Sequence, residues 1–428
     1  MVAAAVEPPA TEPHNGASAT PETQNALLVA FARLLAMYGT PAHRVETALA
    51  ALASRWGLRG SFFATPTAVF AEIEREGETT SRLIRVEPAE VRLDRLVQLD
   101  DTLERTLAGE LAPDKAITRV REIETKPALY GATQTAAAFG LMGAAAAVFF
   151  GGGVWGVGLG LLTAMMVGTI AMTAGRSGRI ARVSEFLAGL ASALLASVAV
   201  AAMAHHGWGV ADAGVVSLAG LIVLLPGLTI TISVSELASR NMVAGSARLV
   251  SAATALLSLG FGAAIGARGG TAFVDWMGWA AAAASPTPLP EWALLPALLS
   301  AAVGLTVVFH APFRALLLFA LVGGFSFGTA RFCSLVVGPE LAAFLAALAI
   351  GVVANIYARA CRRPTALVTM PGIILLVPGS MGFRSISSFM SEDAVGGVQT
   401  AFGVFLVATA IVMGLLLANA AVHPRRVL

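Results

Sequence analysis

Cysteine and lysine are scarce in this 428-residue chain, and their scarcity argues against several classes of protein. The two cysteines, Cys333 and Cys361, have no metal-ligand spacing, so a thiolate metal centre is not expected. Lysine is almost missing beside abundant alanine and arginine, a composition typical of GC-rich bacteria. No Lys-Ser or Lys-Thr step follows the glycines at 151–153, and no Walker sequence occurs elsewhere, so we expect no ATP-driven activity.

Charge is scarce in most of the chain. Residues 1–130 hold 32 of the 54 Asp, Glu, Lys and Arg residues, and the remaining 298 residues hold only 22, eight of them acidic. The charged part has a balance of −4, which argues against a nucleic-acid surface. The composition changes near residues 126–130, so we expect a charged, soluble front followed by an apolar membrane body.

The front is predicted to be a tail and a small cytoplasmic α+β domain. Residues 1–23 are rich in Pro, Ala, Thr and Glu, with neither a basic start nor an apolar core, as in a disordered tail rather than a signal peptide. We call residues 24–128 the front domain. A helical pattern is split at Gly39-Thr40-Pro41, where Thr40 is expected to cap and Pro41 to occupy the first turn. The predicted elements are helices within 20–58, a β-hairpin of 62–73 and 79–86 linked by 74–78, and helices over 91–107 and 113–123.

The membrane body, residues 129–428, consists of apolar stretches of roughly 20 residues, the length that crosses a bilayer. We count ten and predict a polytopic α-helical membrane protein with ten transmembrane helices in two inverted five-helix repeats. The repeats are residues 129–268 and 291–428, joined by an extracytoplasmic linker over 269–290. The expected spans are 131–150, 154–174, 186–204, 213–235, 246–266, 291–309, 314–331, 339–357, 366–386 and 397–418.

Arginine positions predict the orientation of these spans. With the front domain in the cytoplasm, eleven arginines of the body fall on the cytoplasmic side and three outside, as the positive-inside rule requires. The C-terminus is then cytoplasmic too, and Cys333 and Cys361 lie on opposite faces, which excludes a disulfide between them. The cytoplasmic set is Arg176, Arg179, Arg182, Arg240, Arg248, Arg314, Arg359, Arg362, Arg363, Arg425 and Arg426; the outer set is Arg268, Arg331 and Arg384.

Two spans carry the same interruption, Leu224-Leu225-Pro226-Gly227 in the fourth and Leu376-Val377-Pro378-Gly379 in the ninth. Proline removes a backbone donor, and lipid cannot satisfy the carbonyls left unpaired, so such a break needs protein or water around it. Because five is odd, the two repeats must be inverted. The two breaks should then approach each other near the midplane, where transporters bind their substrates. An ordinary kink filled by a neighbouring Ser or Thr is the alternative at each step.

The chain resembles the threonine/serine exporter family over most of its length, through several motifs that are each weak alone. They are Tyr38-Gly39-Thr40-Pro41, His43-Arg44-Val45-Glu46, Thr65-Pro66-Thr67, Leu225-Pro226-Gly227-Leu228-Thr229-Ile230-Thr231, Ser235-Glu236-Leu237, Ser246-Ala247-Arg248, Asn355-Ile356-Tyr357-Ala358-Arg359, Leu376-Val377-Pro378-Gly379-Ser380 and Arg384-Ser385. The resemblance implies proton-driven export of L-threonine and L-serine across the plasma membrane. Some split relatives are associated with dicarboxylate efflux, so a dicarboxylate such as succinate stays open as the alternative substrate.

A hydroxy amino acid needs donors for its carboxylate, acceptors for its ammonium group and a polar contact for its hydroxyl. Broken helices supply the first two, and nearby hydroxyls supply the third. The predicted substrate-binding residues are Pro226, Gly227, Thr229, Thr231, Ser233, Pro378, Gly379, Ser380 and Arg384. For each hydroxyl the alternative is a bond to its own helix, and for Arg384 an anchor at the membrane rim.

Glu236 and Asp212 are the predicted proton-coupling residues, because they flank Pro226 at the two ends of the fourth span. The alternatives are a helix cap for Asp212 and a pair with Arg240 for Glu236.

We predict no cofactor, metal or catalytic residue, because no nucleophile has a base in reach; a membrane-tethered hydrolase or sensor is the least favoured interpretation. The expected partners are the amino-acid substrate, protons and membrane lipid, without nucleic acid, and association into a homo-oligomer stays open. The front domain could gate the cytoplasmic mouth, hold protomers together or contact a partner.

Overall fold

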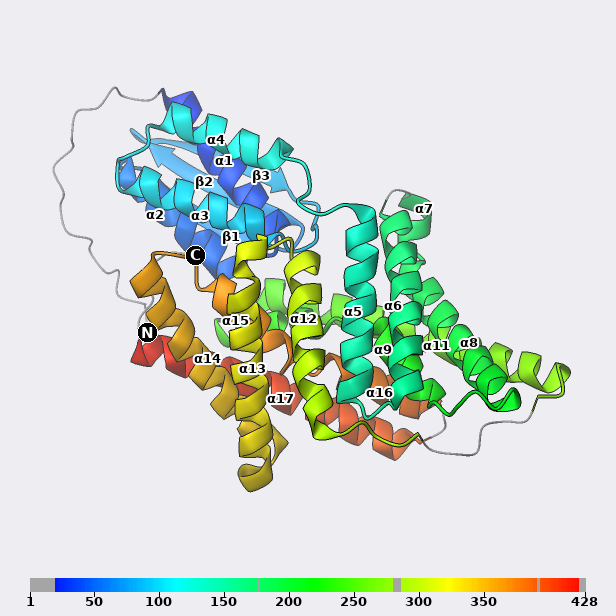
Figure 1. The fold of residues 1–428 in the computed structure, drawn as a ribbon. Helices are drawn as coiled ribbons and strands as arrows, with labels where there is room; N and C mark the ends of the chain where they lie inside the picture. The colour runs from blue at the N-terminus through cyan, green and yellow to red at the C-terminus, as the bar shows by residue number, and fades with distance from the viewer. Residues whose placement is uncertain (1–19, 176–177, 280–285, 391–392, 423–428) are drawn as a thin grey trace.

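The computed structural model describes residues 20–175, 178–279, 286–390 and 393–422. Most of the expected tail, together with Arg176, Arg425 and Arg426, lies outside the described residues. The front domain sits at one end of a bundle of long helices, close to the ends of α12, α13 and α15 (Figure 1). We call this end of the bundle the front-domain side and the opposite end the far side.

The front domain contains four helices and a three-stranded antiparallel sheet in the order β1-β2-β3. The strands β2 and β3 form the predicted hairpin, turned by Glu76 and Gly77, which both have positive φ as a two-residue type I′ turn requires. The elements are α1 (Pro21–Met37), α2 (Ala42–Arg55), β1 (Arg59–Thr65), β2 (Ala68–Arg75), β3 (Glu78–Arg85), α3 (Leu93–Leu107) and α4 (Pro113–Thr125).

Two details of the front domain differ from the prediction. The run expected as one strand over 62–73 is divided between β1 and β2, because Pro66 and Thr67 turn the chain. The cap predicted for Thr40 is wrong: Pro41 is the N-cap residue of α2 and brings no side-chain hydrogen bond. The N-terminal backbone donors of α2 are therefore left for another part of the molecule.

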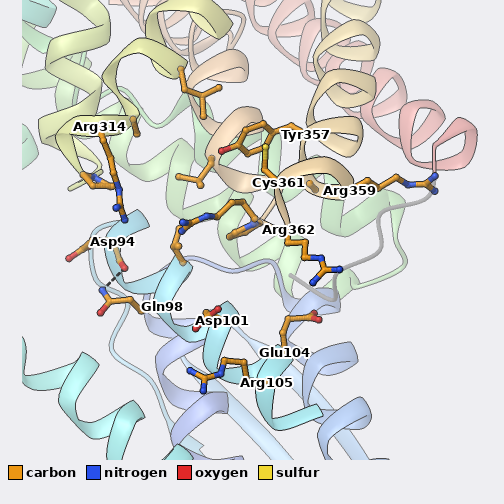
Figure 2. A pocket seen from close by; sticks show the side chains of 18 of the residues that line it. Asp94, Gln98, Asp101, Glu104, Arg105, Arg314, Tyr357, Arg359, Cys361 and Arg362 are labelled. Carbon is orange, nitrogen blue, oxygen red and sulfur yellow. Dashed lines mark hydrogen bonds between the residues drawn. The ribbon is translucent and has the colours of Figure 1, made fainter. Parts of the chain in front are cut away.

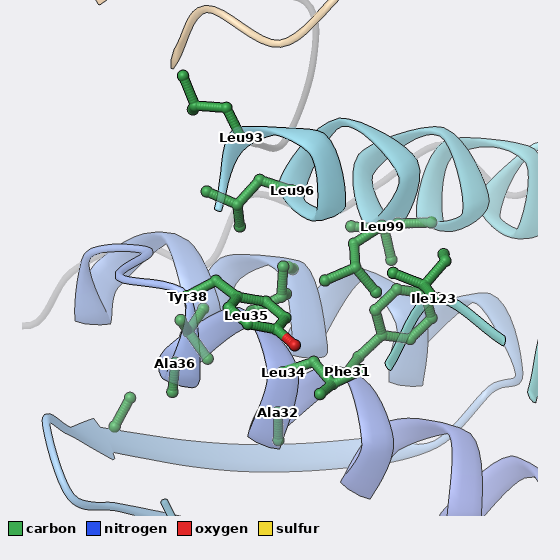
Figure 3. Packing of buried hydrophobic residues seen from close by; sticks show 14 of the residues in the cluster. Phe31, Ala32, Leu34, Leu35, Ala36, Tyr38, Leu93, Leu96, Leu99 and Ile123 are labelled. Atoms are coloured by element: carbon green, nitrogen blue, oxygen red, sulfur yellow. The ribbon is translucent and has the colours of Figure 1, made fainter. Parts of the chain in front are cut away.

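Large apolar side chains fill the core of the front domain. Phe31 and Leu35 of α1 face Leu99 of α3 and Ile123 of α4, and all four are almost fully buried (Figure 3). This follows from the amphipathic spacing of these residues, which gathers them on one face of each helix. Arg33 and Glu124 close the rim of this packing with an ion pair of 2.7 Å.

The membrane body is helical, and nine segments of its described part are long and apolar enough to cross a membrane. The fourth expected span is not among these nine because it is broken into two short helices, α9 and α10. The elements are α5 (Ala132–Phe149), α6 (Val154–Ala174), α7 (Gly178–Ala181), α8 (Ser184–His205), α9 (Ala213–Leu221), α10 (Gly227–Ala238), α11 (Met242–Trp276), η1 (Glu291–Ala293), α12 (Leu294–Val308), η2 (Phe313–Ala315), α13 (Leu316–Val337), α14 (Pro339–Cys361), α15 (Ala366–Ile374), α16 (Gly379–Met390) and α17 (Ala394–Ala421).

The helix α11 is longer than expected. It runs through Trp276, so residues 269–276 continue a helix where the linker over 269–290 was predicted to begin. Its glycines explain how so long a helix packs: a Cβ on Gly262 would lie 2.1 Å from the Phe186 carbonyl oxygen of α8, and one on Gly266 2.2 Å from that of Leu190. Such small residues let two membrane helices approach backbone to backbone.

Candidate functional site

The two Pro-Gly steps end one helix and begin the next, as the sequence predicts, and they meet in space. A Cβ added to Gly227 would lie 2.8 Å from the Gly379 nitrogen and 2.1 Å from Val377 Cγ1. A Cβ added to Gly379 would lie 3.2 Å from the Gly227 Cα. The two backbones are thus in direct contact, which only glycine allows. We call this contact the helix crossing.

Two helices begin at the helix crossing and run in opposite directions. The helix α10 starts at Gly227 and leads toward the front-domain side, and α16 starts at Gly379 and leads toward the far side. The first backbone N–H groups of a helix have no partner inside it and carry a partial positive charge, so an N-terminus attracts anionic groups. Two such N-termini at one point make the helix crossing suited to a carboxylate.

A pocket of about 530 Å³ lies on the far side of the helix crossing, between α8, α9, α11 and α16. It brings together Asp212 and Arg384, which are 172 positions apart in the sequence, and adds Arg268 from α11. We call it the far pocket. Its charged walls can meet both ends of a zwitterion.

The polar residues of the far pocket have distinct local roles. Asp212 caps α9 by accepting a hydrogen bond from the Val215 N–H at 3.0 Å, as its alternative interpretation held. The Arg384 guanidinium lies 5.2 Å from the centroid of the Phe150 ring, a cation–π contact. Ser217 is only 7% exposed, and its hydroxyl has no hydrogen-bond partner in the described part of the chain. A buried hydroxyl of this kind is available to a bound ligand.

Sequence reasoning missed Arg268 and Ser217 as pocket residues. Arg268 was placed at the outer end of the first repeat, and only the continuation of α11 past that point brings it beside Arg384. Ser217 lies four residues before the end of α9, carries no charge and belongs to no motif, so nothing in the local sequence marks it as a pocket residue.

Several hydroxyls near the helix crossing bond to the backbone, as their alternative interpretation held. Thr231 donates to the Gly227 carbonyl at 3.2 Å and Ser233 to that of Ile230 at 2.7 Å, both within α10. Thr229 and Ser380 are half-buried next to Pro226 and Pro378. Of the predicted hydroxyl contacts, Thr229 and Ser380 are therefore the better placed.

Glu236 lies at the other end of α10, where the body meets the front domain. Its carboxylate is fully buried, and the Arg248 Nε donates to both of its oxygens at 3.1 Å. The predicted alternative partner, Arg240, is not in this pair. The Ala42 N–H, at the start of α2, donates to Glu236 Oε1 at 3.0 Å. Nothing in the local sequence connects Glu236 to a residue 194 positions earlier.

A second cavity, of about 1250 Å³, opens on the front-domain side, between α3 and the ends of α13 and α14. Figure 2 shows its two walls. Arg314, Arg359 and Arg362 come from the membrane body, whereas Asp101 and Glu104 come from α3. We call it the front cavity. It lies on the front-domain side of the bundle, opposite to the far pocket. The described residues hold no cluster of three or more His, Cys, Asp or Glu that could bind a metal ion.

Comparison with known proteins identifies the family to which these features belong. The family model ThrE matches residues 26–269, more than half of the chain, and a second model, described as "Threonine/Serine exporter, ThrE", matches residues 296–421. The chain belongs to the threonine/serine exporter family. This is a family of exporters, and the apolar helices described above make the chain a multi-pass membrane protein.

Relatives of the threonine/serine exporter family occur in bacteria and in yeasts. A threonine/serine exporter of Corynebacterium glutamicum is 24% identical over 77% of this chain and 67% of its own length. A probable threonine/serine exporter of Mycobacterium tuberculosis is 28% identical over 75% of this chain and 60% of its own. Pheromone-regulated membrane protein 10 of Zygosaccharomyces rouxii is 24% identical over 86% of this chain and 37% of its own. The chain thus spans about a third to two thirds of these relatives. No solved structure is significantly similar to it.

Proposed function

We propose that this protein is a secondary active exporter of small hydroxy amino acids, L-threonine and L-serine, coupled to protons, in a bacterial plasma membrane. The observation that carries the proposal is the helix crossing, where two helix N-termini meet beside a pocket with both signs of charge. An α-carboxylate fits the N-termini or Arg384, an ammonium group fits Asp212, and a hydroxyl fits Ser217 or Thr229. The family and two of the relatives are described as threonine/serine exporters, which supports this substrate class.

The packing of the body supports ten membrane segments in two inverted five-helix repeats. The third and fifth segments of each half approach through glycine: α8 and α11 at Gly189, and α14 and α17 at Gly414, where an added Cβ would lie 2.2 Å and 2.5 Å from a carbonyl oxygen of the partner helix. The fourth segment of each half is the broken one. Inverted-repeat transporters form their substrate sites from broken helices in corresponding positions of the two halves.

Arginine positions support a cytoplasmic front-domain side, and hence a cytoplasmic front domain. Among the described residues beyond 130, eight arginines lie on that side when the helices are followed end to end, and three lie on the far side. The first set is Arg179, Arg182, Arg240, Arg248, Arg314, Arg359, Arg362 and Arg363; the second is Arg268, Arg331 and Arg384.

Glu236 is the better candidate of the two acids for proton coupling. It is fully buried and contacts both Arg248 and the front domain. Protonating it would remove its charge attraction to Arg248 and weaken the contact between the body and the front domain. Asp212 is exposed and engaged as a helix cap. We therefore assign Asp212 to the substrate ammonium group rather than to the proton.

One observation favours a dicarboxylate as a second candidate substrate. Arg268 and Arg384 line the same pocket, and two guanidinium groups suit two carboxylates. Asp212 in that pocket acts against such a ligand through charge repulsion. The two candidates therefore differ in how they respond to the charge at position 212.

Efflux from proteoliposomes tests the proposal. Vesicles preloaded with labelled L-threonine, L-serine or succinate receive an imposed pH gradient, and the intact chain is compared with Glu236→Gln and with the exposed far-side control Glu340→Gln. We expect gradient-driven amino-acid efflux that falls at least tenfold in Glu236→Gln and stays unchanged in Glu340→Gln. Absence of flux for all three solutes would reject the proposal, and succinate efflux alone would establish the second candidate.

Asp212→Asn separates the two substrates, because asparagine caps a helix as well as aspartate does and only the charge is lost. For threonine, the half-saturating concentration should rise about tenfold, the size expected for one charge-assisted hydrogen bond. For succinate it should fall or stay constant. Asp275→Asn, at the far end of α11 and outside the far pocket, is the matched control.

A further inference from the structure

One turn of the front domain touches both broken helices on the front-domain side. This turn, residues 41–46, begins α2 and is called the clamp turn here. It reaches Glu236 near the end of α10 and Thr365 at the start of α15. These are the front-domain halves of the two helices that meet at the helix crossing. The far halves, α9 and α16, line the far pocket instead.

The contact with α10 is made by backbone. The Ala42 N–H donates to Glu236 Oε1 at 3.0 Å, and Pro41 leaves this donor without a side-chain cap. A helix N-terminus attracts a carboxylate, so Glu236 does for α2 what a capping aspartate would do. The same carboxylate is paired with Arg248 of α11. One buried group thus joins the front domain, α10 and α11.

The contact with α15 is made by a side chain. Arg44 Nη1 donates to the Thr365 hydroxyl at 3.2 Å, and Thr365 is the N-cap residue of α15 and only 2% exposed. Burial lowers the pKa of Arg44, and the charge of Asp100 on α3 opposes this effect. Arg44 is half-buried where the front domain meets the start of α15.

The clamp turn moves with the front domain because Glu46 ties it to the sheet. The Glu46 carboxylate accepts a hydrogen bond from the Ala64 N–H of β1 at 2.8 Å. The same turn contains the half-buried His43, and Glu46 also feels the negative charge of Glu236. Displacement of the front domain would therefore carry both clamp contacts away together.

We propose that the clamp turn positions α10 and α15, and that it must leave them for the front-domain side of the carrier to open. Two half-helices that are held by the same turn cannot separate while both of its contacts persist. Motion about the helix crossing therefore requires the front domain to swing out, which makes Ala42 and Arg44 positioning residues of the transport cycle. The inference rests on the proposed function only where it concerns transport.

Two substitutions remove one clamp contact each. Ala42→Pro deletes the donor to Glu236 at the first helical position, where proline suits the helix, and the extended Pro41 before it (ψ 145°) accommodates a following proline. Thr365→Val removes the acceptor of Arg44 with little change of shape. Ala132→Pro is the matched control, since Ala132 also lies at the first position of a helix after an extended residue, and its N–H donates to no other element in the described part of the chain.

Pulsed electron paramagnetic resonance measures the opening in the full chain without any substrate. Spin labels go on the exposed Cys361 and on Asp101→Cys, which face each other across the front cavity, with Cys333 replaced by alanine. We expect Ala42→Pro and Thr365→Val each to raise the long-distance population at least threefold, and Ala132→Pro to leave it unchanged. Equal distance distributions in all four proteins would overturn the inference.

The transport arm uses the same two cysteines. A short bismaleimide across positions 101 and 361 should lower threonine efflux at least tenfold, whereas a cross-link of Arg33→Cys to Glu124→Cys, inside the front domain, should leave it unchanged. Ala42→Pro should lower the internal half-saturating concentration about threefold, because a larger open fraction raises apparent affinity. A purely structural defect would lower the maximal rate alone. Efflux unaffected by the cross-link would overturn the gating role.

The two arms distinguish the possible failures. If the intact chain moves no solute, the proposed function fails, and the spin-label distances still decide the clamp. If threonine efflux is present but neither the distances nor the cross-link respond, the clamp is rejected and the exporter stands.

Discussion

The front domain and the membrane body hold themselves together in opposite ways. In the front domain, large side chains such as Phe31, Leu35 and Leu99 fill the space between helices. In the body, the closest contacts are between backbones at glycine, as where Gly262 of α11 packs against α8 and at the helix crossing. The hydrophobic effect drives the first kind of packing through burial of apolar area. Helices in lipid have no such driving force between them and associate through close van der Waals packing instead.

The difference between these two kinds of packing indicates where the molecule can move. A contact between two backbones admits one geometry and tolerates no added atom, so each glycine-packed pair behaves as a block. The junction between the front domain and the body combines apolar packing, in which Leu93 joins Leu305 and Phe309 in one buried cluster, with a few polar contacts, among them Ala42 with Glu236. Polar contacts of this kind can break and re-form singly, so motion should concentrate at the junction.

The largest effect is expected from filling the helix crossing. Gly227→Val places atoms where Val377 and the Gly379 backbone already lie, so the two broken helices must separate or tilt. Overpacking of this kind costs about 1–3 kcal/mol or more, and we expect efflux to fall on the order of 100-fold. The test is threonine efflux at equal amounts of folded protein in the vesicles.

Gly158→Val on α6 is the control for this substitution, because a Cβ there meets nothing within 4 Å. If Gly227→Val transported as well as Gly158→Val, the backbone contact would have no part in transport, and the contrast between the two packing modes would lose its functional meaning.

Truncating the front-domain core should be costly for the front domain and should spare the body. Phe31→Ala removes a fully buried ring and should destabilise the front domain by about 3–5 kcal/mol. Hydrogen exchange measured by mass spectrometry should show the loss in peptides of α1, α3 and α4, with unchanged protection in α8 and α11. Phe63→Ala, at a ring that is 45% exposed, is the control. Equal loss of protection in both regions would show that they unfold as one unit.

The smallest expected effect is a change in the stability of the front domain as the pH falls. Burial, helped by the neighbouring Arg44, lowers the pKa of His43 to about 4 from 6.5. Because the folded protein resists a proton that the unfolded chain accepts, this histidine contributes stability above pH 6.5 and loses it as the pH falls toward 4. Burial also lowers the pKa of His310, in the loop after α12, to about 4, with the same sign.

Glu46 acts in the other direction, because burial raises its pKa above 4.5 and so favours the folded state on mild acidification. His43→Leu should therefore flatten the loss of front-domain protection between pH 6.5 and 4 without abolishing it. His205→Leu, in the far-side turn where His205 stacks near Trp279, should leave the pH profile unchanged. A profile that is the same for His43→Leu and the intact chain would remove His43 from this account.

The parts of the fold that local chemistry decides could be predicted from the sequence. Apolar length predicted the long helices, and the Pro-Gly steps predicted both breaks, since proline acts wherever it stands. The cap predicted at Thr40 was wrong, and its replacement could not be predicted, because the donor of Ala42 is satisfied by Glu236 from another part of the chain. The length of α11 escaped because Arg268 and the polar residues after it resemble a linker, whereas the helix continues over them.

The candidate site divides in the same way. Asp212 and Arg384 stood out as rare charges near the membrane, and the far pocket contains both. Ser217 and Arg268 join them only through the packing of α8, α9, α11 and α16, which no single segment encodes. The partners of Glu236 depend on how the front domain docks, and docking is a property of two surfaces rather than of one motif.

The bond between Arg44 and Thr365 also bears on how the protein is made. These residues are 321 positions apart, so the ribosome finishes the front domain and the first half of the body long before Thr365 emerges. All helices and strands of the front domain end by residue 125, so they are synthesised long before α15. Closing the front-domain side is therefore a late event in biogenesis. A nascent chain stalled before α15 would carry a turn that holds only one of its two helices.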